Sequence, residues 1–265
     1  MKIGLTTLIL PAEWDLDTTL NAVSDAGYTA LELAVRDEGY CSIETAASDL
    51  SQIAARAEAR GIEVTGICPA ARSLPRDLMN SDEGVRTQSV ATFFRMMDIA
   101  DAIGVGPLLV VPGRLSREVC YDDAYRYALD GMRELAGRAE AMNIDLAIEY
   151  VWNDFLLSPM EFARFCDEIG SARVGFYFDS GNMVHTGYPE HWIRICAEHL
   201  MAVHFKDFRR SDRTWTPLLE GDVDFIAVMN ELRRAGYDGH VISEVDPSIA
   251  SLEATEEAIR NIASK

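Results

Sequence analysis

The side chains best suited to chemistry lie at the ends of apolar segments in the second half of the chain. Each one interrupts a run of aliphatic or aromatic residues that is otherwise typical of a buried strand. A carboxylate buried in such a place costs several kcal/mol unless it is paired or bound to a metal. Any one of these residues alone would be interpreted as a loop cap or a salt-bridge partner. Four consecutive segments with the same feature indicate a common site, and the residues are Glu149, Asp179, His204 and Glu244.

This set of side chains favours a particular class of metal ion. Three carboxylates and one imidazole form a hard, oxygen-rich set of ligands, which suits Mn²⁺ or Mg²⁺. A structural Zn²⁺ ion prefers Cys and His. The sequence therefore predicts one divalent metal ion, with Mn²⁺ as the first choice and Mg²⁺, Co²⁺ or Zn²⁺ as alternatives.

Two glutamates on one metal ion also indicate a type of reaction. The metal can polarise a carbonyl group and stabilise an enediolate. One glutamate can remove a proton from the adjacent carbon, and the other can return it. Aldose–ketose isomerisation and epimerisation both proceed in this way.

Eight short segments of strand character alternate with helical stretches along the whole chain. A chain of alternating strands and helices is typical of a parallel sheet. The predicted helices cover 44–60, 89–103, 124–142, a segment that includes 232–235, and 252–262. The predicted strands cover 2–7, 30–35, 63–68, 108–112, 145–150, 174–179, 201–207 and 240–245.

The fold class that fits this pattern is α/β, a single (β/α)₈ TIM barrel. Such a barrel needs about 250 residues, and the 265 residues show no linker or shift in composition, so we expect one domain over 1–265. An open doubly wound sheet is the alternative, but it usually has a glycine-rich turn after its first strand, where this chain has Thr-Thr-Leu at 6–8. In a barrel, the carboxyl ends of the strands form the active site.

Composition excludes several classes of function. The chain has 24 Lys and Arg against 43 Asp and Glu, a net charge of −19, which disfavours binding to nucleic acid and to anionic membranes. No segment approaches the roughly 18 apolar residues of a membrane span, and the amino terminus, MKIGLTTLIL, lacks a signal-peptide cleavage site. We expect a cytoplasmic protein with free thiols, because its five cysteines are scattered and form no CxxC pair: Cys41, Cys68, Cys120, Cys166 and Cys196.

The motifs around the candidate residues resemble those of the xylose isomerase-like TIM-barrel family of sugar and sugar-phosphate isomerases and epimerases. Within that family, the chain looks most similar to the ketose 3-epimerases of the tagatose/psicose 3-epimerase type and to ketose-phosphate epimerases. The matching segments occur in the family's order: LAIEY at 146–150, FDSGNMVHTGYP at 178–189, VHFKDFRR at 203–210, LEGDVDF at 219–225 and ISEVD at 242–246.

The resemblance implies a role for each of the four clustered residues. Glu149, Asp179, His204 and Glu244 correspond to the metal ligands of the family, and Glu149 and Glu244 also correspond to its acid/base pair. The implied reaction is C3 epimerisation of a ketose or ketose phosphate through a metal-bound enediolate. Implied partners are a small sugar substrate and further copies of the chain, in a dimer or tetramer.

The resemblance also suggests substrate contacts, with two departures from the family pattern. Arg210 falls where related epimerases contact substrate oxygens. Phe155 replaces a second glutamate common in those enzymes, and Asn182 replaces a histidine, so that His185 is a candidate substitute. Strand alternation places Lys206 on the same side as His204, where it either faces the site or forms a salt bridge at the rim.

Other residues near the predicted strand ends have two interpretations each. Glu32 either supports the site or has a structural role, and the sequence favours the structural role. The tryptophans at 14 and 152 either line a sugar pocket or pack in the core. Three loop arginines could bind a phosphate or carboxylate of the substrate, or could simply be solvated: Arg72, Arg76 and Arg114.

Three alternative functions follow from the same residues. An inosose dehydratase-like enzyme would use the same metal and a similar base but would eliminate water. A nuclease of the AP-endonuclease type is disfavoured, because its three zinc ions need several histidines and this chain has five, none before His185. A barrel that has lost its chemistry is disfavoured by the intact set of four candidate ligands.

Overall fold

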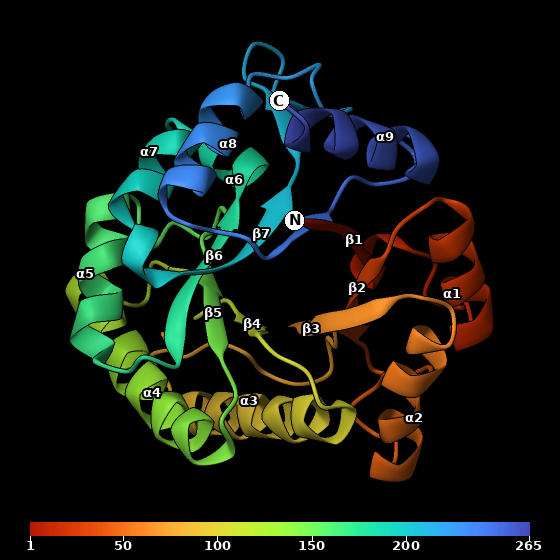
Figure 1. Ribbon diagram of the computed structural model, residues 1–265. Coiled ribbons are helices and arrows are strands. Elements are labelled where there is room, and N and C mark those ends of the chain that lie inside the picture. Colours follow the sequence, from red (N-terminus) through yellow and green to blue (C-terminus); the bar gives the residue numbers. More distant parts are fainter.

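Eight parallel strands close into a barrel in the computed structural model, which describes all 265 residues. The strand order is β1-β10-β7-β6-β5-β4-β3-β2, so that the first strand pairs with the last (Figure 1). The predicted (β/α)₈ barrel is therefore confirmed. The strands are β1 (Lys2–Thr6), β2 (Ala30–Val35), β3 (Glu63–Pro69), β4 (Leu108–Val110), β5 (Leu146–Glu149), β6 (Val174–Asp179), β7 (Leu200–Phe205) and β10 (His240–Ser243).

A ring of helices surrounds the barrel (Figure 1). None of them is both long enough and apolar enough to span a membrane. Two short 3₁₀ helices, Thr7–Ile9 and Ala197–His199, complete the connections. The α-helices are α1 (Leu16–Asp25), α2 (Ala47–Glu58), α3 (Glu83–Ile103), α4 (Tyr121–Met142), α5 (Pro159–Ile169), α6 (Ser180–Val184), α7 (Pro189–Ile195), α8 (Phe225–Arg234) and α9 (Leu252–Ala263).

The sequence of the strands explains why they form the interior. Every residue of β2 and β6 is buried, because one face of each strand packs inside the barrel and the other against helices. Local signals set the ends of the helices. The Asp15 side chain accepts a hydrogen bond from the backbone of Thr18 at the start of α1. Gly104 and Asn143 adopt left-handed backbone conformations that end α3 and α4.

The segment after β7 differs from the prediction. The expected strand 201–207 ends at Phe205, and Asp207–Arg209 forms a separate strand, β8, paired antiparallel with β9 (Thr214–Thr216). The buried Asp207 carboxylate joins β8 to the segment after β9 by accepting hydrogen bonds from backbone N–H groups, those of Phe208, Gly221 and Val223. This hairpin places Trp215 beside the carboxyl ends of the barrel strands.

Candidate active site

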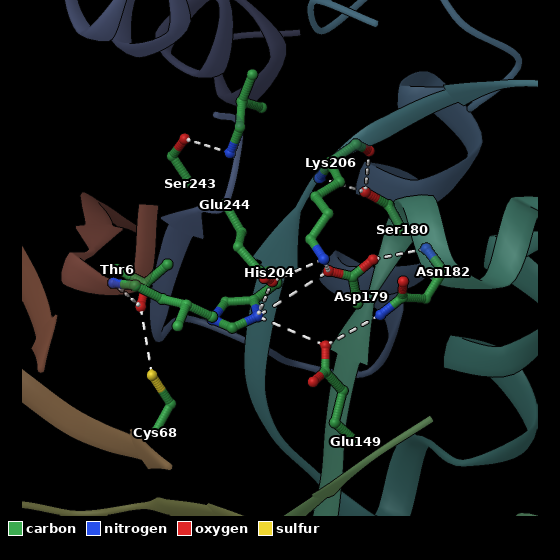
Figure 2. Close-up of polar contacts among 12 residues, drawn as sticks. Thr6, Cys68, Glu149, Asp179, Ser180, Asn182, His204, Lys206, Ser243 and Glu244 are labelled. Carbon is green, nitrogen blue, oxygen red and sulfur yellow. Dashed lines mark hydrogen bonds and ion pairs between the residues drawn. The ribbon is translucent and has the colours of Figure 1, made fainter. Parts of the chain in front are cut away.

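The four candidate side chains converge at the carboxyl end of the barrel. Glu149 ends β5, Asp179 ends β6, His204 is next to last in β7, and Glu244 directly follows β10. One potential ligand atom from each lies within 4.8 Å of those of the other three. Figure 2 shows them pointing toward a common centre. Three of them are buried, and Glu244 is only partly exposed. The strand ends therefore bring together the groups that the sequence singled out.

Two atoms of this cluster are buried without a hydrogen-bond partner, Asp179 Oδ2 and His204 Nδ1. His204 Nδ1 lies 3.0 Å from Glu244 Oε2 and 3.7 Å from Glu149 Oε1, and Asp179 Oδ2 lies 4.0 Å from it. Buried polar atoms in proteins are normally paired. The convergence of these unpaired atoms therefore indicates a binding site for a cation. Three carboxylates and one ring nitrogen fit a divalent cation.

Glu32 orients the imidazole from the opposite side. Its Oε2 lies 3.3 Å from His204 Nε2, and its Oε1 accepts a 2.7 Å hydrogen bond from the Tyr177 hydroxyl. A proton on Nε2, held by Glu32, leaves the Nδ1 lone pair free for a cation. The sequence favoured a structural role for Glu32, whereas the structure places it in contact with the site. Tyr177 was not singled out at all.

The two glutamates have different polar partners. Glu244 Oε2 lies 2.9 Å from Lys206 Nζ, whereas Glu149 Oε1 accepts a 3.2 Å hydrogen bond from the amide of Asn182. Burial raises the pKa of Glu149 to about 7. Burial would also raise the pKa of Glu244, but the charges of Lys206 and His204 outweigh it and hold that pKa at about 2. The pKa values of the two carboxyl groups are thus shifted in opposite directions from the ordinary value for glutamate.

Lys206 and Asn182 both reach the site. The Lys206 ammonium lies 3.6 Å from Asp179 Oδ2 as well as beside Glu244, so its side chain points inward on the side of His204. The backbone N–H of Asn182 donates to Asp179 Oδ1 over 2.7 Å, which makes Asp179 the N-cap of α6. This bond fixes the Asp179 carboxylate and brings the Asn182 amide to Glu149.

A cavity of about 750 Å³ opens above the cluster. Glu149, His204 and Glu244 contribute to its lining, together with Asn182 and Lys206. His204 is its only histidine, which leaves no set of imidazoles for a site with three zinc ions.

Two stacked tryptophans form an aromatic wall of this cavity. The rings of Trp152 and Trp215 are nearly parallel, at 9°, with centroids 5.0 Å apart. Trp14 lines a neighbouring cavity instead. Sequence reasoning missed Trp215, because the hairpin that carries it was not predicted.

Arg210 and His185 do not line the cavity. The Arg210 guanidinium donates to the carbonyl oxygen of Val184 over 2.5 Å and to that of Gly187. The His185 ring packs on Trp152 with centroids 4.3 Å apart. The His185 side chain therefore supports the wall of the cavity in this structure, and contact of either side chain with a substrate stays a prediction.

Phe155 replaces the polar group expected from related epimerases, and it is fully integrated in the apolar core. Its ring is buried and packs against Tyr121, Tyr125 and Phe165. No carboxylate therefore enters the cavity from this position.

Comparison with known proteins identifies the family. Residues 20–265 match the family model described as the xylose isomerase-like TIM barrel. The chain belongs to this family. Among curated proteins, it is 23% identical to the L-ribulose-5-phosphate 3-epimerase UlaE of Salmonella heidelberg over 263 residues, which cover 97% of this chain and 92% of that protein.

Solved structures share the fold at low sequence identity. A D-tagatose 3-epimerase-like protein superposes with a TM-score of 0.82 and 18% identity, covering 100% of this chain and 99% of the other. The IolI protein with a bound zinc atom superposes with a TM-score of 0.81 and 17% identity, covering 100% and 98%. Both share the barrel fold of this chain.

Proposed function

We propose that this protein is a divalent-metal-dependent ketose 3-epimerase that acts on a ketose or ketose phosphate. The observation that carries the proposal is the convergence of Glu149 and Glu244 on Asp179 and His204 at the base of a sugar-sized cavity. The UlaE relative is named a 3-epimerase of a ketose phosphate, and the tagatose 3-epimerase-like structure has the same fold, which supports this reaction over dehydration.

The side chains would divide the work as follows. Glu149, Asp179, His204 and Glu244 would hold the cation, for which Mn²⁺ is our first choice. When bound, a divalent cation polarises the substrate carbonyl and stabilises negative charge on its oxygens. One glutamate would remove the C3 proton, and the other would return a proton to the opposite face.

The surrounding groups would prepare this proton transfer. Lys206 keeps the Glu244 carboxyl ionised, and the Asn182 amide orients Glu149. Trp152 and Trp215 would exclude water and pack against the CH groups of the sugar. We also infer substrate contacts for Asn182 and Lys206, and for Arg210 and His185 once their loops adjust to a substrate.

Three further properties belong to the proposal. Residues 1–265 would act as one domain. A cytoplasmic location would suit the five free cysteines, four of them buried. The chain would assemble as a dimer or tetramer.

The deciding experiment follows the C3 proton. We expect ketoses or their phosphates, incubated with Mn²⁺ in deuterated water, to be converted to their C3 epimers and to gain deuterium at C3 without loss of water. Chelation of the metal should abolish turnover. Formation of a dehydrated product would support the dehydratase alternative instead, and turnover that persists after chelation would contradict the metal-dependent mechanism.

A further inference from the structure

A second polar wall of the cavity is formed by the loops that follow β3 and β4. Arg76 and Arg114 both line the cavity there. The backbone N–H of Leu78 donates to Pro112 across the two loops over 2.7 Å. Gly113 packs so closely on Asp77 that a Cβ at this glycine would lie 2.2 Å from Oδ1 of that carboxylate. The two loops that carry Arg76 and Arg114 therefore pack against each other.

The cations in the cavity differ in how their charge is compensated. Lys206 lies beside two carboxylates, those of Glu244 and Asp179, so its charge is already neutralised. The guanidiniums of Arg76 and Arg114 form no ion pair, and each donates one hydrogen bond, to a backbone carbonyl oxygen.

These carbonyl contacts leave most of each guanidinium unused. Arg76 donates to Pro69 over 2.7 Å and Arg114 to Trp152 over 2.5 Å, while a guanidinium has five N–H donors. The intervening Asp77 carboxylate is turned toward the backbone of Met79, at 3.1 Å. Its other oxygen accepts a 2.9 Å hydrogen bond from the Asn80 amide.

We infer that Arg76 and Arg114 form a subsite for an anionic group of the substrate, a phosphate ester or a carboxylate on the carbon chain beyond C3. This inference rests on the proposed ketose 3-epimerase function and adds the substrate class. Paired guanidiniums bind oxyanions through charge-assisted, often bidentate hydrogen bonds. In a chain with 43 acidic and 24 basic residues, two guanidinium groups without an ion pair on one wall locally oppose the overall negative field.

The test uses pairs of substrates that differ in one anionic group. The values of kcat/KM with Mn²⁺ are measured for L-ribulose and L-ribulose 5-phosphate, and for D-fructose and D-fructuronate. We expect the anionic member of at least one pair to be preferred by about tenfold or more. A larger preference in the first pair identifies a phosphate group, and in the second pair a carboxylate. Equal turnover of the neutral and anionic members in both pairs would overturn the inference while leaving the epimerase intact.

Variants tie this preference to the two side chains. Arg76→Met and Arg114→Met should each lower kcat/KM for the anionic substrate by about tenfold to a hundredfold, with little effect on its neutral partner. Arg117→Met is the matched control, because Arg117 is exposed on the same loop and does not line the cavity. Equal losses on neutral and anionic substrates would show that the arginines are merely structural.

Two further measurements distinguish failure of the anion subsite from failure of the proposed epimerase function. Arg76 also holds the Pro69 carbonyl, so Arg76→Lys, which keeps the positive charge, should retain more of the anion preference than Arg76→Met. Binding of inorganic phosphate, measured by calorimetry on the Mn²⁺ form, should weaken in Arg76→Met and Arg114→Met. Phosphate binding that depends on these arginines, in a protein without epimerase activity, would support the subsite and contradict the proposed function. Phosphate binding unaffected by both variants would contradict the subsite.

Discussion

The two halves of the barrel differ in what their strands deliver to the cavity. The first four strands end in Thr6, Val35, Pro69 and Val110, none of which titrates in the ordinary range of pH. In the later four, the clustered carboxylates and imidazole lie at the strand end or within one residue of it. The first half instead contributes Glu32 from inside the barrel and two arginines from its loops. In the proposed mechanism, one half would supply the reacting groups, and the other would orient them and face the remainder of the substrate.

The strongest test of this division is a pair of isosteric substitutions in the second half. Glu149→Gln and Glu244→Gln should each lower kcat by about 10²–10⁴-fold, because each removes a group that transfers a proton. The control is Glu63→Gln at the start of β3, where the carboxylate is exposed and paired with Lys2, and activity should be retained. Full activity in either of the first two variants would refute the two-base mechanism.

The next test concerns the contribution of the first half. Glu32→Gln should weaken Mn²⁺ binding by about 10–100-fold, because the amide cannot hold His204 in the same charged hydrogen bond. Titration calorimetry of the metal-free protein with Mn²⁺ measures this directly. Unchanged affinity would mean that the second half holds its cation without help from β2.

Metal loading should also change stability. A cation that binds only the folded protein stabilises it by about 2.7 kcal/mol when present at 100 times its Kd. Thermal unfolding with and without Mn²⁺ should show this gain, and Asp179→Asn should reduce it, because it removes one of the charged groups that face the proposed cation. An equal stabilisation by Mn²⁺ in Asp179→Asn would mean that the cation binds at a site that does not include Asp179.

The smallest effect on metal affinity and stability is expected for Tyr177, which hydrogen-bonds to Glu32. Tyr177→Phe removes the 2.7 Å hydrogen bond to Glu32 but keeps the ring against His204. The change should cost about 0.5–1.5 kcal/mol, since it deletes one buried hydrogen bond. Chemical denaturation and Mn²⁺ titration together measure it. If Tyr177→Phe lowered metal affinity more than Glu32→Gln, Tyr177 would matter more to the site than Glu32, which would contradict its role as a support for Glu32.

Much of the fold could be predicted from the sequence, because strands buried on both faces appear as continuous apolar runs. The four clustered residues could be found for the same reason, as polar interruptions at comparable places. Helix α3 begins at Glu83, earlier than the predicted 89, because its first turns are polar and carry little periodicity. The prediction extended the seventh strand through Lys206 to Asp207, whose carboxylate instead anchors a hairpin through contacts distant in sequence.

The orientation of individual side chains was harder to predict from the sequence than the fold. Tyr177 has the same character as its apolar neighbours in the sequence, so nothing marks its hydrogen bond to Glu32. The motif spacing gives Arg210 a position but no orientation, and its guanidinium turns to the carbonyl oxygens of Val184 and Gly187. Such contacts depend on how loops pack together, which short sequence patterns do not encode.

The contact between Glu32 and His204 has a consequence for the order of events during synthesis. Glu32 leaves the ribosome long before the four side chains that would hold the proposed cation, and Glu244 comes last among these. The imidazole acquires its orienting partner only when β2 and β7 belong to one closed barrel. Tight binding of the proposed cation would therefore come late in folding, after the barrel has closed.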